Sequence, residues 1–404
     1  MINRWQEAWL RESLDVRRGV HLTGVRQCGK STLAEHVAAG MRILSLDDSA
    51  YLKAAKDDPR SFVERLDGKT LLIDEIQKAP ELLEAIKIRV DHDNSPGQYL
   101  ITGSSNLHFV KAVKDSLAGR LGRIRLRTLA LGELLGGKGD FLKRAFARDF
   151  PLVCPDMGKR EVIHRAFCGG YPEPIEFPER ARKAWYVEYL DDLLTKDIQA
   201  VTEIRKLDAL RKVSQWLLAY SSKFFELKSL CAAAGLGKET IDNYISALMA
   251  IYVFDEVKPW AKCDYAKIGK RSKFYASDSG LLGNLLGWTE SGVYYDDDAC
   301  GKLVETWVYH ELASLADLDD GYGIFQYRDS DKREIDFVVE DASGKLLGVE
   351  VKAGAVSSED FKHLKWFGAN LARSPFTGIV LYSGSNTLRF GEGFYAVPLS
   401  ALGM

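Results

Sequence analysis

The first 140 residues alternate short apolar runs with stretches of amphipathic, helical spacing. The apolar runs are VHLTG, MRILSLD, TLLIDE and QYLITGS, and the segments between them include STLAEHVAAG and PELLEAIKIRVD. Runs such as LLID and YLIT are apolar at consecutive positions, which is typical of parallel strands that are buried on both faces. The pattern predicts an α/β domain at residues 1–150, with a parallel sheet between two layers of helices.

The pattern becomes mainly helical over residues 151–290. Two glycines and two prolines in FCGGYPEPIEF mark the expected domain junction, and a long amphipathic helix follows in ARKAWYVEYLDDLLTKDIQAV. Farther along, FFELKSLCAAAGLGKETIDNYISALMAIYVFDEVKPW predicts a helix, a glycine-containing turn, a second helix and a short strand. This is the order of a winged helix-turn-helix, and its second helix, from Lys238 to Met249, is not strongly basic. Reading DNA and packing against protein are equally compatible with that helix.

A mixed pattern returns over residues 291–404. A helix in GKLVETWVYHELASLA is followed by the strands IFQYRD, REIDFVVE, KLLGVEVKA and TGIVLYS. This alternation predicts a further α/β unit with a central sheet. The expected fold class is therefore α/β, with a parallel-sheet domain, a helical or winged-helix middle domain and a C-terminal α/β domain.

Size and composition agree with a folded protein of several domains. The chain has 404 residues, which exceeds one ordinary core, and its hydrophobic content of 46% and charged content of 28% are typical of globular proteins. Because the net charge is only −2, nucleic acid would have to be bound by local basic clusters. The six cysteines lack C-x-x-C spacing, and no apolar run approaches the roughly 18 residues of a membrane helix. We expect a cytoplasmic protein without membrane contact, zinc or disulfides.

The octapeptide GVRQCGKS at residues 24–31 matches the phosphate-loop pattern G-x-x-x-x-G-K-[ST]. An apolar strand precedes it and a helix follows it, so the helix N-terminus would face a bound phosphate. Lys30 supplies a positive charge for the β- and γ-phosphates, and Ser31 supplies a hydroxyl for Mg²⁺. The pattern predicts ATP and Mg²⁺ as cofactors, with nucleotide contacts from Gly24, Val25, Arg26, Gln27, Cys28, Gly29, Lys30, Ser31 and Thr32.

Two carboxylates, Asp74 and Glu75, stand at the end of the apolar strand TLLIDE. Ligands of parallel sheets bind at the carboxyl ends of the strands, so Asp74 is expected to hold Mg²⁺ and to belong to the nucleotide site. Glu75 follows the metal ligand directly and is the predicted general base for the attacking water. Lys30 and Glu75 are thus the predicted catalytic residues of this site.

Polar residues after the next strand, LITGSSN, are candidates for sensing the γ-phosphate. Ser104, Ser105 and Asn106 all qualify, and capping of the following helix is an alternative role. Alternating arginines follow in SLAGRLGRIRLR, where Arg120 or Arg123 would act as a catalytic arginine finger on a neighbouring subunit. Such a finger implies a homo-oligomer, whereas the alternative is a solvated strand arginine.

Several of these segments together resemble a prokaryotic family of AAA-type ATPases. The resemblance rests on GVRQCGKSTL, LLIDEIQKAPELLEAIKIRVD, YLITGSSNL, SLAGRLGRIRLRTLALGEL, GGYPEP and KFYASDSGLLGNLL, and it extends over nearly the whole chain. It implies an ATPase module that is followed by a characteristic C-terminal domain of poorly assigned function. Cys28 departs from the small or aliphatic residue that is commoner in this family, and the loop should tolerate it because the backbone N–H makes the contact.

A second group of chemically important residues lies in EIDFVVEDASGKLLGVEVKAG, at residues 334–354. A hairpin that is symmetric about Ser343 places Asp336 opposite Glu350. Alternation then puts Asp336, Glu350 and Lys352 on one face, and the other face carries Ile335, Phe337, Val349 and Val351. Two opposed carboxylates repel unless a cation lies between them, which predicts a Mg²⁺ site.

The D…E-x-K pattern resembles that of the PD-(D/E)xK restriction-endonuclease-like superfamily. The resemblance implies that Asp336 and Glu350 bind Mg²⁺, that Lys352 positions the attacking water, and that Glu305 on the preceding helix completes the metal site. One hypothesis is therefore an ATP-gated enzyme that cleaves DNA or RNA. The alternative is a non-cleaving ATP-dependent switch that binds DNA or a protein partner, with Glu350 and Lys352 paired on a solvated hairpin face.

Overall fold

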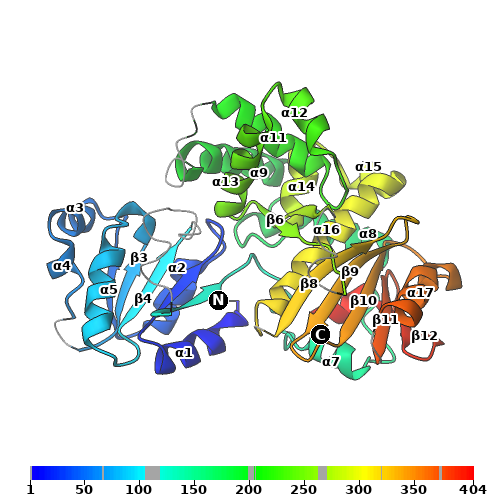
Figure 1. The fold of residues 1–404 in the computed structure, drawn as a ribbon, viewed down its shortest axis with the longest axis horizontal. Helices are drawn as coiled ribbons and strands as arrows, with labels where there is room; N and C mark the ends of the chain where they lie inside the picture. The colour runs from blue at the N-terminus through cyan, green and yellow to red at the C-terminus, as the bar shows by residue number, and fades with distance from the viewer. Residues whose placement is uncertain are drawn as a thin grey trace.

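The computed structural model describes residues 2–65, 68–104, 119–198, 204, 206–262, 271–319, 321–372 and 375–404. Figure 1 shows an N-terminal α/β domain in blue and cyan, a helical middle part in green, and a C-terminal sheet in yellow to red. Among the described residues, no helix is long and apolar enough to cross a membrane.

The N-terminal sheet is parallel throughout and has the strand order β2-β3-β4-β1-β5. Its strands β1, β3 and β4 are buried along their whole length, as the continuous apolar runs predicted. One apolar core lies under α1 and α2 and another under α5, so helices cover both faces and the predicted architecture is confirmed. The strands are β1 Gly19–Thr23, β2 Arg42–Ser45, β3 Leu71–Asp74, β4 Tyr99–Gly103 and β5 Leu121–Arg125; the helices are α1 Gln6–Val16, α2 Lys30–Val37, α3 Ser49–Asp57, α4 Pro59–Phe62 and α5 Leu82–His92, with the 3-10 turn η1 Ile76–Lys78.

Two short helices after β5 pack against the C-terminal part of the chain. Helix α6 (Leu131–Leu135) contacts the terminal 3-10 turn η7 (Leu399–Gly403), and α7 (Phe141–Ala147) contacts α16 and β10 of the C-terminal domain. Figure 1 accordingly draws α7 beside the C-terminal sheet. The sequence pattern had grouped both helices with the first domain, because it reports local periodicity and not the surface against which a helix packs.

The middle part is helical and contains one two-stranded antiparallel sheet, β6-β7. Helix α12, a turn at Gly235 with φ of +65°, helix α13 and β6 follow the order that the sequence predicted. Whether this unit contacts nucleic acid stays a prediction. The elements are α8 Lys159–Cys168, η3 Pro174–Glu176, α9 Glu179–Asp192, the π-helical turn η4 Leu193–Asp197, α11 Leu207–Ala219, α12 Leu227–Ala234, α13 Lys238–Ala250, β6 Phe254–Val257, β7 Lys273–Ala276, α14 Ser279–Leu285 and α15 Glu290–Tyr295.

The C-terminal sheet is mixed, with the strand order β12-β13-β11-β10-β9-β8. Strands β8, β9 and β10 are antiparallel neighbours, and β10, β11 and β13 run parallel. Buried side chains of α16 and of α17 belong to two separate cores that include residues of this sheet. The elements are α16 Asp297–Ala316, β8 Tyr322–Arg328, β9 Glu334–Asp341, β10 Leu346–Lys352, η6 Ser358–Phe361, α17 Lys362–Asn370, β11 Phe376–Tyr382, β12 Leu388–Gly391 and β13 Phe394–Pro398.

The β9–β10 hairpin has the predicted register. The register of the hairpin is as predicted from Leu346, which pairs with Glu340, to Val349, which pairs with Phe337, and the placement of Asp336 opposite Glu350 stays a prediction. The predicted faces are wrong in one respect, because Ile335 joins the core of α17 and Phe337 joins the core of α16. The physical reason is a register shift between β8 and β9, which interrupts the alternation of side chains between these two residues.

Candidate functional site

The phosphate loop connects β1 to α2, and glycine makes its path possible. Gly24 has a φ of +151°, and a Cβ atom on it would lie 2.1 Å from the carbonyl oxygen of Leu126. Gly29 has a φ of +98° and directly precedes α2, so the first N–H groups of this helix face the loop. The Lys30 Nζ atom donates to the Val25 carbonyl oxygen at 2.8 Å, which holds the ammonium group over the loop.

Arg4, which the sequence did not single out, holds the phosphate loop from the N-terminal segment. Its Nη1 atom donates to the Cys28 carbonyl oxygen at 2.7 Å, and its Nη2 atom donates to the Arg127 carbonyl oxygen at 2.6 Å. Its Nε atom forms an ion pair of 2.9 Å with Glu133. The Cys28 thiol is fully buried and lies 3.4 Å from the Leu126 carbonyl oxygen, so this unusual loop residue points away from the nucleotide side.

The predicted magnesium ligands Ser31 and Asp74 lie together. Ser31 Oγ donates to Asp74 Oδ1 at 3.0 Å, and Thr102 of the neighbouring strand β4 donates to the same carboxylate oxygen. A hydroxyl and a carboxylate beside the loop are hard oxygen ligands, so this pair fits Mg²⁺. Thr102 also accepts a hydrogen bond of 3.1 Å from the Glu75 backbone N–H, and therefore joins both carboxylate residues to β4.

Glu75 follows β3 in a left-handed backbone conformation, with a φ of +61°. Burial raises the pKa of its carboxyl group, Asp74 raises it further, and Lys30 and Gln77 oppose the rise. The Gln77 amide donates both to Glu75 and to Ser104 Oγ, the latter at 2.9 Å. Ser104, one of the three candidate sensors, is thus linked to the predicted base, whereas the candidates at positions 105 and 106 lie outside the described residues.

The middle domain reaches this network through Asp197, at the end of the π-helical turn η4. Ser104 Oγ donates to Asp197 Oδ1 at 3.2 Å, and Arg26 of the phosphate loop pairs with Asp197 Oδ2 at 3.1 Å. Tyr189 of α9 donates to the Arg26 carbonyl oxygen at 2.9 Å. No motif marked Asp197 in the sequence, because its partners are distant in the chain.

A cavity of about 650 Å³ lies at the junction of these elements. Its walls come from the phosphate loop, from the segment after β3 and from the middle domain, and they include Arg26, Gln27, Gly29, Lys30, Ser31, Thr32, Asp47, Glu75, Gln77, Lys78, Pro172, Glu173, Lys196 and Asp197. The size suits a nucleotide, since small-molecule sites usually measure about 300–1,000 Å³.

Arg120 lies at the amino end of the parallel strands, opposite the end at which the phosphate loop lies. Leu121 pairs with Gly19 at the start of the parallel strands, whereas the phosphate loop follows their ends. The Arg120 Nε atom lies 2.5 Å from Asp91 Oδ1. Arg120 therefore does not line the cavity of its own chain, and a role on a neighbouring subunit stays a prediction. Arg123 donates to the Tyr252 hydroxyl of the middle domain at 2.8 Å.

Comparison with known families agrees with this geometry. Residues 16–135 match a family described as an AAA domain. The N-terminal domain is thus similar in sequence to AAA domains and has the parallel sheet and phosphate loop of a P-loop ATPase. Residues 159–292 and 300–402 match two families that are described only as domains of unknown function, DUF8612 and DUF4143.

The chain is also similar to individual proteins. It is 28% identical over 359 residues to the uncharacterized proteins Rv2008c of Mycobacterium tuberculosis and Mb2031c of Mycobacterium bovis, which covers 87% of this chain and 74% of each relative. Among solved structures, the Walker-type ATPase PABY2304 of Pyrococcus abyssi has 15% identity and a TM-score of 0.42, over 70% of this chain and 96% of that one. A RuvB variant of Thermotoga maritima has 19% identity and a TM-score of 0.28, over 62% and 87%.

The second predicted site lies in the C-terminal domain, where β9 and β10 carry Asp336 and Glu350. The Val351 backbone N–H donates to Asp336 Oδ2 at 2.9 Å. Burial, together with the charge of Glu305, raises the pKa of Asp336 to about 7. Burial and the charge of Asp336 likewise raise the pKa of Glu350. The charge of Asp336 thus disfavours ionisation of Glu350, as expected for close acidic groups.

The predicted third metal ligand, Glu305, acts electrostatically on Asp336 and Glu350 and is itself paired with a lysine. Its Oε1 atom lies 3.1 Å from Lys273 Nζ and accepts a hydrogen bond of 2.7 Å from the Tyr275 hydroxyl. In the part of the chain that the structure describes, no three His, Cys, Asp or Glu side chains are placed to hold a metal ion. The prediction that Glu305 completes a metal site with Asp336 and Glu350 stays a prediction, and Lys273 supplies a positive charge to Glu305 in the structure.

Lys352, the predicted water-positioning residue, pairs with Asp360 of η6 at 3.3 Å, and its side chain is 43% exposed. The carboxylate of Asp360 therefore competes with any substrate for this ammonium group. A catalytic role for Lys352 stays a prediction.

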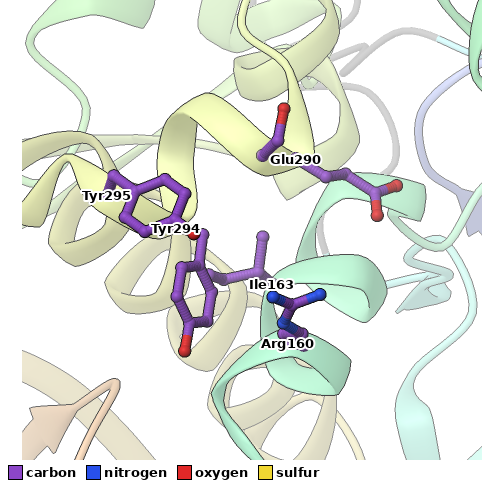
Figure 2. Close-up of a pocket in the computed structure, with 6 residues that line it drawn as sticks. Arg160, Ile163, Glu290, Tyr294 and Tyr295 are labelled. Atoms are coloured by element: carbon purple, nitrogen blue, oxygen red, sulfur yellow. The ribbon is translucent and has the colours of Figure 1, made fainter.

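A separate hollow of about 230 Å³ lies between α8 and α15. Figure 2 shows Arg160 and Ile163 on one side and Tyr294 and Tyr295 on the other. The Arg160 guanidinium lies 5.1 Å from the centre of the Tyr294 ring, a cation–π contact that joins the two helices. No predicted site residue lines this hollow.

Proposed function

We propose that the chain is an ATP-hydrolysing switch in which the middle domain closes the nucleotide cavity of the ATPase domain. One observation carries this proposal. The cavity is lined both by the phosphate loop with Glu75 and by Lys196 and Asp197 of the middle domain. A ligand in this cavity would contact both domains, so its binding and hydrolysis would change the contact between them.

The side chains support ATP hydrolysis in named roles. Lys30 and the N–H groups of the loop bind the phosphates, while Ser31 and Asp74 would hold Mg²⁺, which neutralises charge on the phosphates when it is bound. Glu75 takes the proton of the attacking water, and Gln77 orients the Glu75 carboxylate through the hydrogen bond described above. Ser104 accepts a hydrogen bond from Gln77 and donates one to Asp197, and so it connects the environment of Glu75 to the middle domain.

Two substitutions test the proposal together. Lys30→Ala should weaken ATP affinity by at least about tenfold, because it removes a charge-assisted contact to phosphate. Glu75→Gln should retain ATP affinity and lower the rate of phosphate release by roughly 10²–10⁴-fold. Fluorescent-nucleotide titration and phosphate-release kinetics measure the two effects. Unchanged ATP affinity in Lys30→Ala would overturn the assignment of the site.

We also propose that the C-terminal domain has a restriction-endonuclease-like core that does not cleave. The order α16, β8, β9, β10, α17, β11 and the antiparallel pairing of β9, which carries Asp336, with β10, which carries Glu350, support that core. The candidate metal ligand Glu305 and the candidate catalytic residue Lys352 do not support a metal-dependent cleavage step. Glu305 forms an ion pair with Lys273, and Lys352 forms one with Asp360. This favours the switch, whose output is binding of DNA or of a protein partner, over the nuclease.

A direct assay distinguishes a switch that only binds its partner from a nuclease. Purified protein with ATP, Mg²⁺ or Mn²⁺ and mixed DNA and RNA substrates should hydrolyse ATP and leave the nucleic acids intact. Cleavage that disappears in Lys352→Ala, with ATP hydrolysis unchanged, would reinstate the nuclease.

A further inference from the structure

A lysine of the middle domain lies among the carboxylates of the C-terminal domain. Lys273 is the first residue of β7, and its side chain is only 1% exposed. Its Nζ atom lies 3.1 Å from Glu305 Oε1 on α16 and 2.7 Å from Glu334 Oε1 on β9. Lysine is almost never fully buried unless it is paired, so these two ion pairs are what keep its ammonium group in place.

Tyr275, two residues farther along β7, fixes the same strand to the same elements. Its hydroxyl donates to Glu305 Oε1 at 2.7 Å, and the residue is fully buried. Its ring stacks on Tyr309 of α16, with centres 4.6 Å apart, and lies 5.5 Å from the ring of Phe337 on β9. Strand β7 is therefore joined to α16 and β9 by both charged and aromatic contacts.

The charged groups around Lys273 disfavour the binding of a second cation. Asp336 interacts electrostatically with Glu305, with Glu334 and with Lys273. Of the other basic groups nearby, Arg328 lies 3.7 Å from Glu334, and Lys352 is paired with Asp360. A divalent ion at Asp336 would lie beside a buried ammonium group, and like charges in a poorly solvated site repel strongly.

We propose that Lys273 is the resident cation of this acidic cluster, which joins the middle domain to the C-terminal domain and excludes divalent metal ions from Asp336 and Glu350. The negative charge of Glu305, Glu334, Asp336 and Glu350 is then balanced by the protein's own ammonium group and not by a divalent ion. This inference does not depend on the ATPase function, because it concerns residues far from the phosphate loop in the fold.

Binding of Mn²⁺ to the full-length protein tests the proposal directly. All measurements use an Asp74→Asn background, which removes the carboxylate expected to bind metal in the ATPase domain, and are made without nucleotide. Electron paramagnetic resonance of free Mn²⁺ should then detect no site that is sensitive to Asp336→Asn. Adding Lys273→Met should create one Mn²⁺ site, at least about tenfold tighter than any in the background. That site should disappear in Lys273→Met with Asp336→Asn.

A control and a stability measurement complete the test. Lys258→Met, an exposed lysine just after β6, should create no site. In EDTA, Lys273→Met should lower the melting temperature by at least about 5 °C, since it removes the ammonium group that pairs with the partly buried carboxylates of Glu305 and Glu334, and Mn²⁺ should restore part of the loss.

Two results would overturn the proposal. One is Mn²⁺ binding that is sensitive to Asp336→Asn while Lys273 is intact. The other is a folded Lys273→Met protein that gains no Mn²⁺ site. If Lys273→Met does not fold, the comparison with and without Asp336→Asn still decides, because both of those proteins retain Lys273.

Discussion

At the scale of single residues, the most consequential position is Glu75. It leaves β3 with a left-handed backbone, sits beside Asp74, and keeps its carboxylate in contact with the Gln77 amide. A proton acceptor must be ionised, and burial makes ionisation of this group harder than in an ordinary glutamate. The Gln77 amide acts in the opposite direction because it donates to the charged form.

The pH dependence of ATP hydrolysis follows from the raised pKa of Glu75 and from the opposing effect of Gln77. Since the pKa of Glu75 is raised, the base gains its proton at a higher pH than a solvated glutamate, and kcat should fall as the pH decreases through that value. Gln77→Ala removes a contact that lowers the pKa, so the acid limb of the kcat–pH profile should move to higher pH. Steady-state kinetics between pH 5 and 9 measure the shift.

A matched control is Gln215→Ala, at an exposed position of α11. It should leave the profile unchanged. An acid limb that stays in place in Gln77→Ala would show that Glu75 is not the titrating base.

The sequence predicted the motif residues of the nucleotide site but not the residues that hold them. Lys30, Ser31 and Asp74 stand in patterns whose spacing carries their chemistry, and the structure brings the three together. Arg4 and Thr102 belong to no pattern, because each acts through a contact with residues that are distant in the chain. Such contacts become visible only when the packing of the elements is known.

At the scale of elements, the hairpin β9–β10 shows which features of a strand are local. Its register follows from its own turn, and so the sequence predicted it correctly. The change of face between Ile335 and Phe337 depends on how β8 pairs with β9, and nothing in the hairpin sequence indicates that pairing. Local patterns therefore predicted the partners of the strands better than the faces of their side chains.

The positive φ of Gly24, between β1 and the phosphate loop, leads to a prediction about stability. Gly24→Ala should reduce stability by roughly 1–3 kcal/mol, because the residue has a positive φ and its added methyl group would meet the Leu126 carbonyl oxygen. It should also weaken ATP binding, since the loop must shift. Chemical denaturation and nucleotide titration measure the two effects.

Gly301→Ala is the control, in an exposed position of α16 where an added Cβ atom meets nothing within 4 Å. It should be neutral or stabilising, as alanine favours a helix over glycine. Equal stability of the two variants would contradict the strained path assigned to Gly24.

At the scale of the whole molecule, the nucleotide cavity depends on two domains. Asp197→Ala should lower kcat by roughly 10- to 100-fold, because Ser104 and Arg26 lose their shared partner and the groups around Glu75 shift. ATP affinity should change much less, since Asp197 is an anion and adds no attraction for phosphate. Parallel measurement of kcat and of nucleotide affinity separates these effects.

Asp191→Ala provides the comparison, since this exposed carboxylate of α9 pairs with Arg211 of α11. It should leave kcat within about twofold, as expected for a surface ion pair. A loss of ATP affinity as large as the loss of kcat in Asp197→Ala would contradict a positioning role.

The periodicity of the sequence predicted the order of the three parts along the chain, but it did not predict the contacts that join them. Arg127, just after β5, pairs with Asp255 of β6 at 2.6 Å and with Asp317 after α16 at 2.7 Å. These ion pairs link all three parts through one side chain that is only 7% exposed. The sequence of this segment is compatible with solvated strand arginines or with arginine fingers, because charge alone does not reveal a partner in another domain.

The contact between Arg4 and the Cys28 carbonyl oxygen has a practical meaning for work on the separate domain. The match to the AAA domain begins at residue 16, and so a shortened protein that starts there would retain every motif residue. It would nevertheless lack the guanidinium group that ties the phosphate loop to Arg127 and hence to the other two domains. Nucleotide affinities measured on such a fragment would describe a loop released from the rest of the molecule.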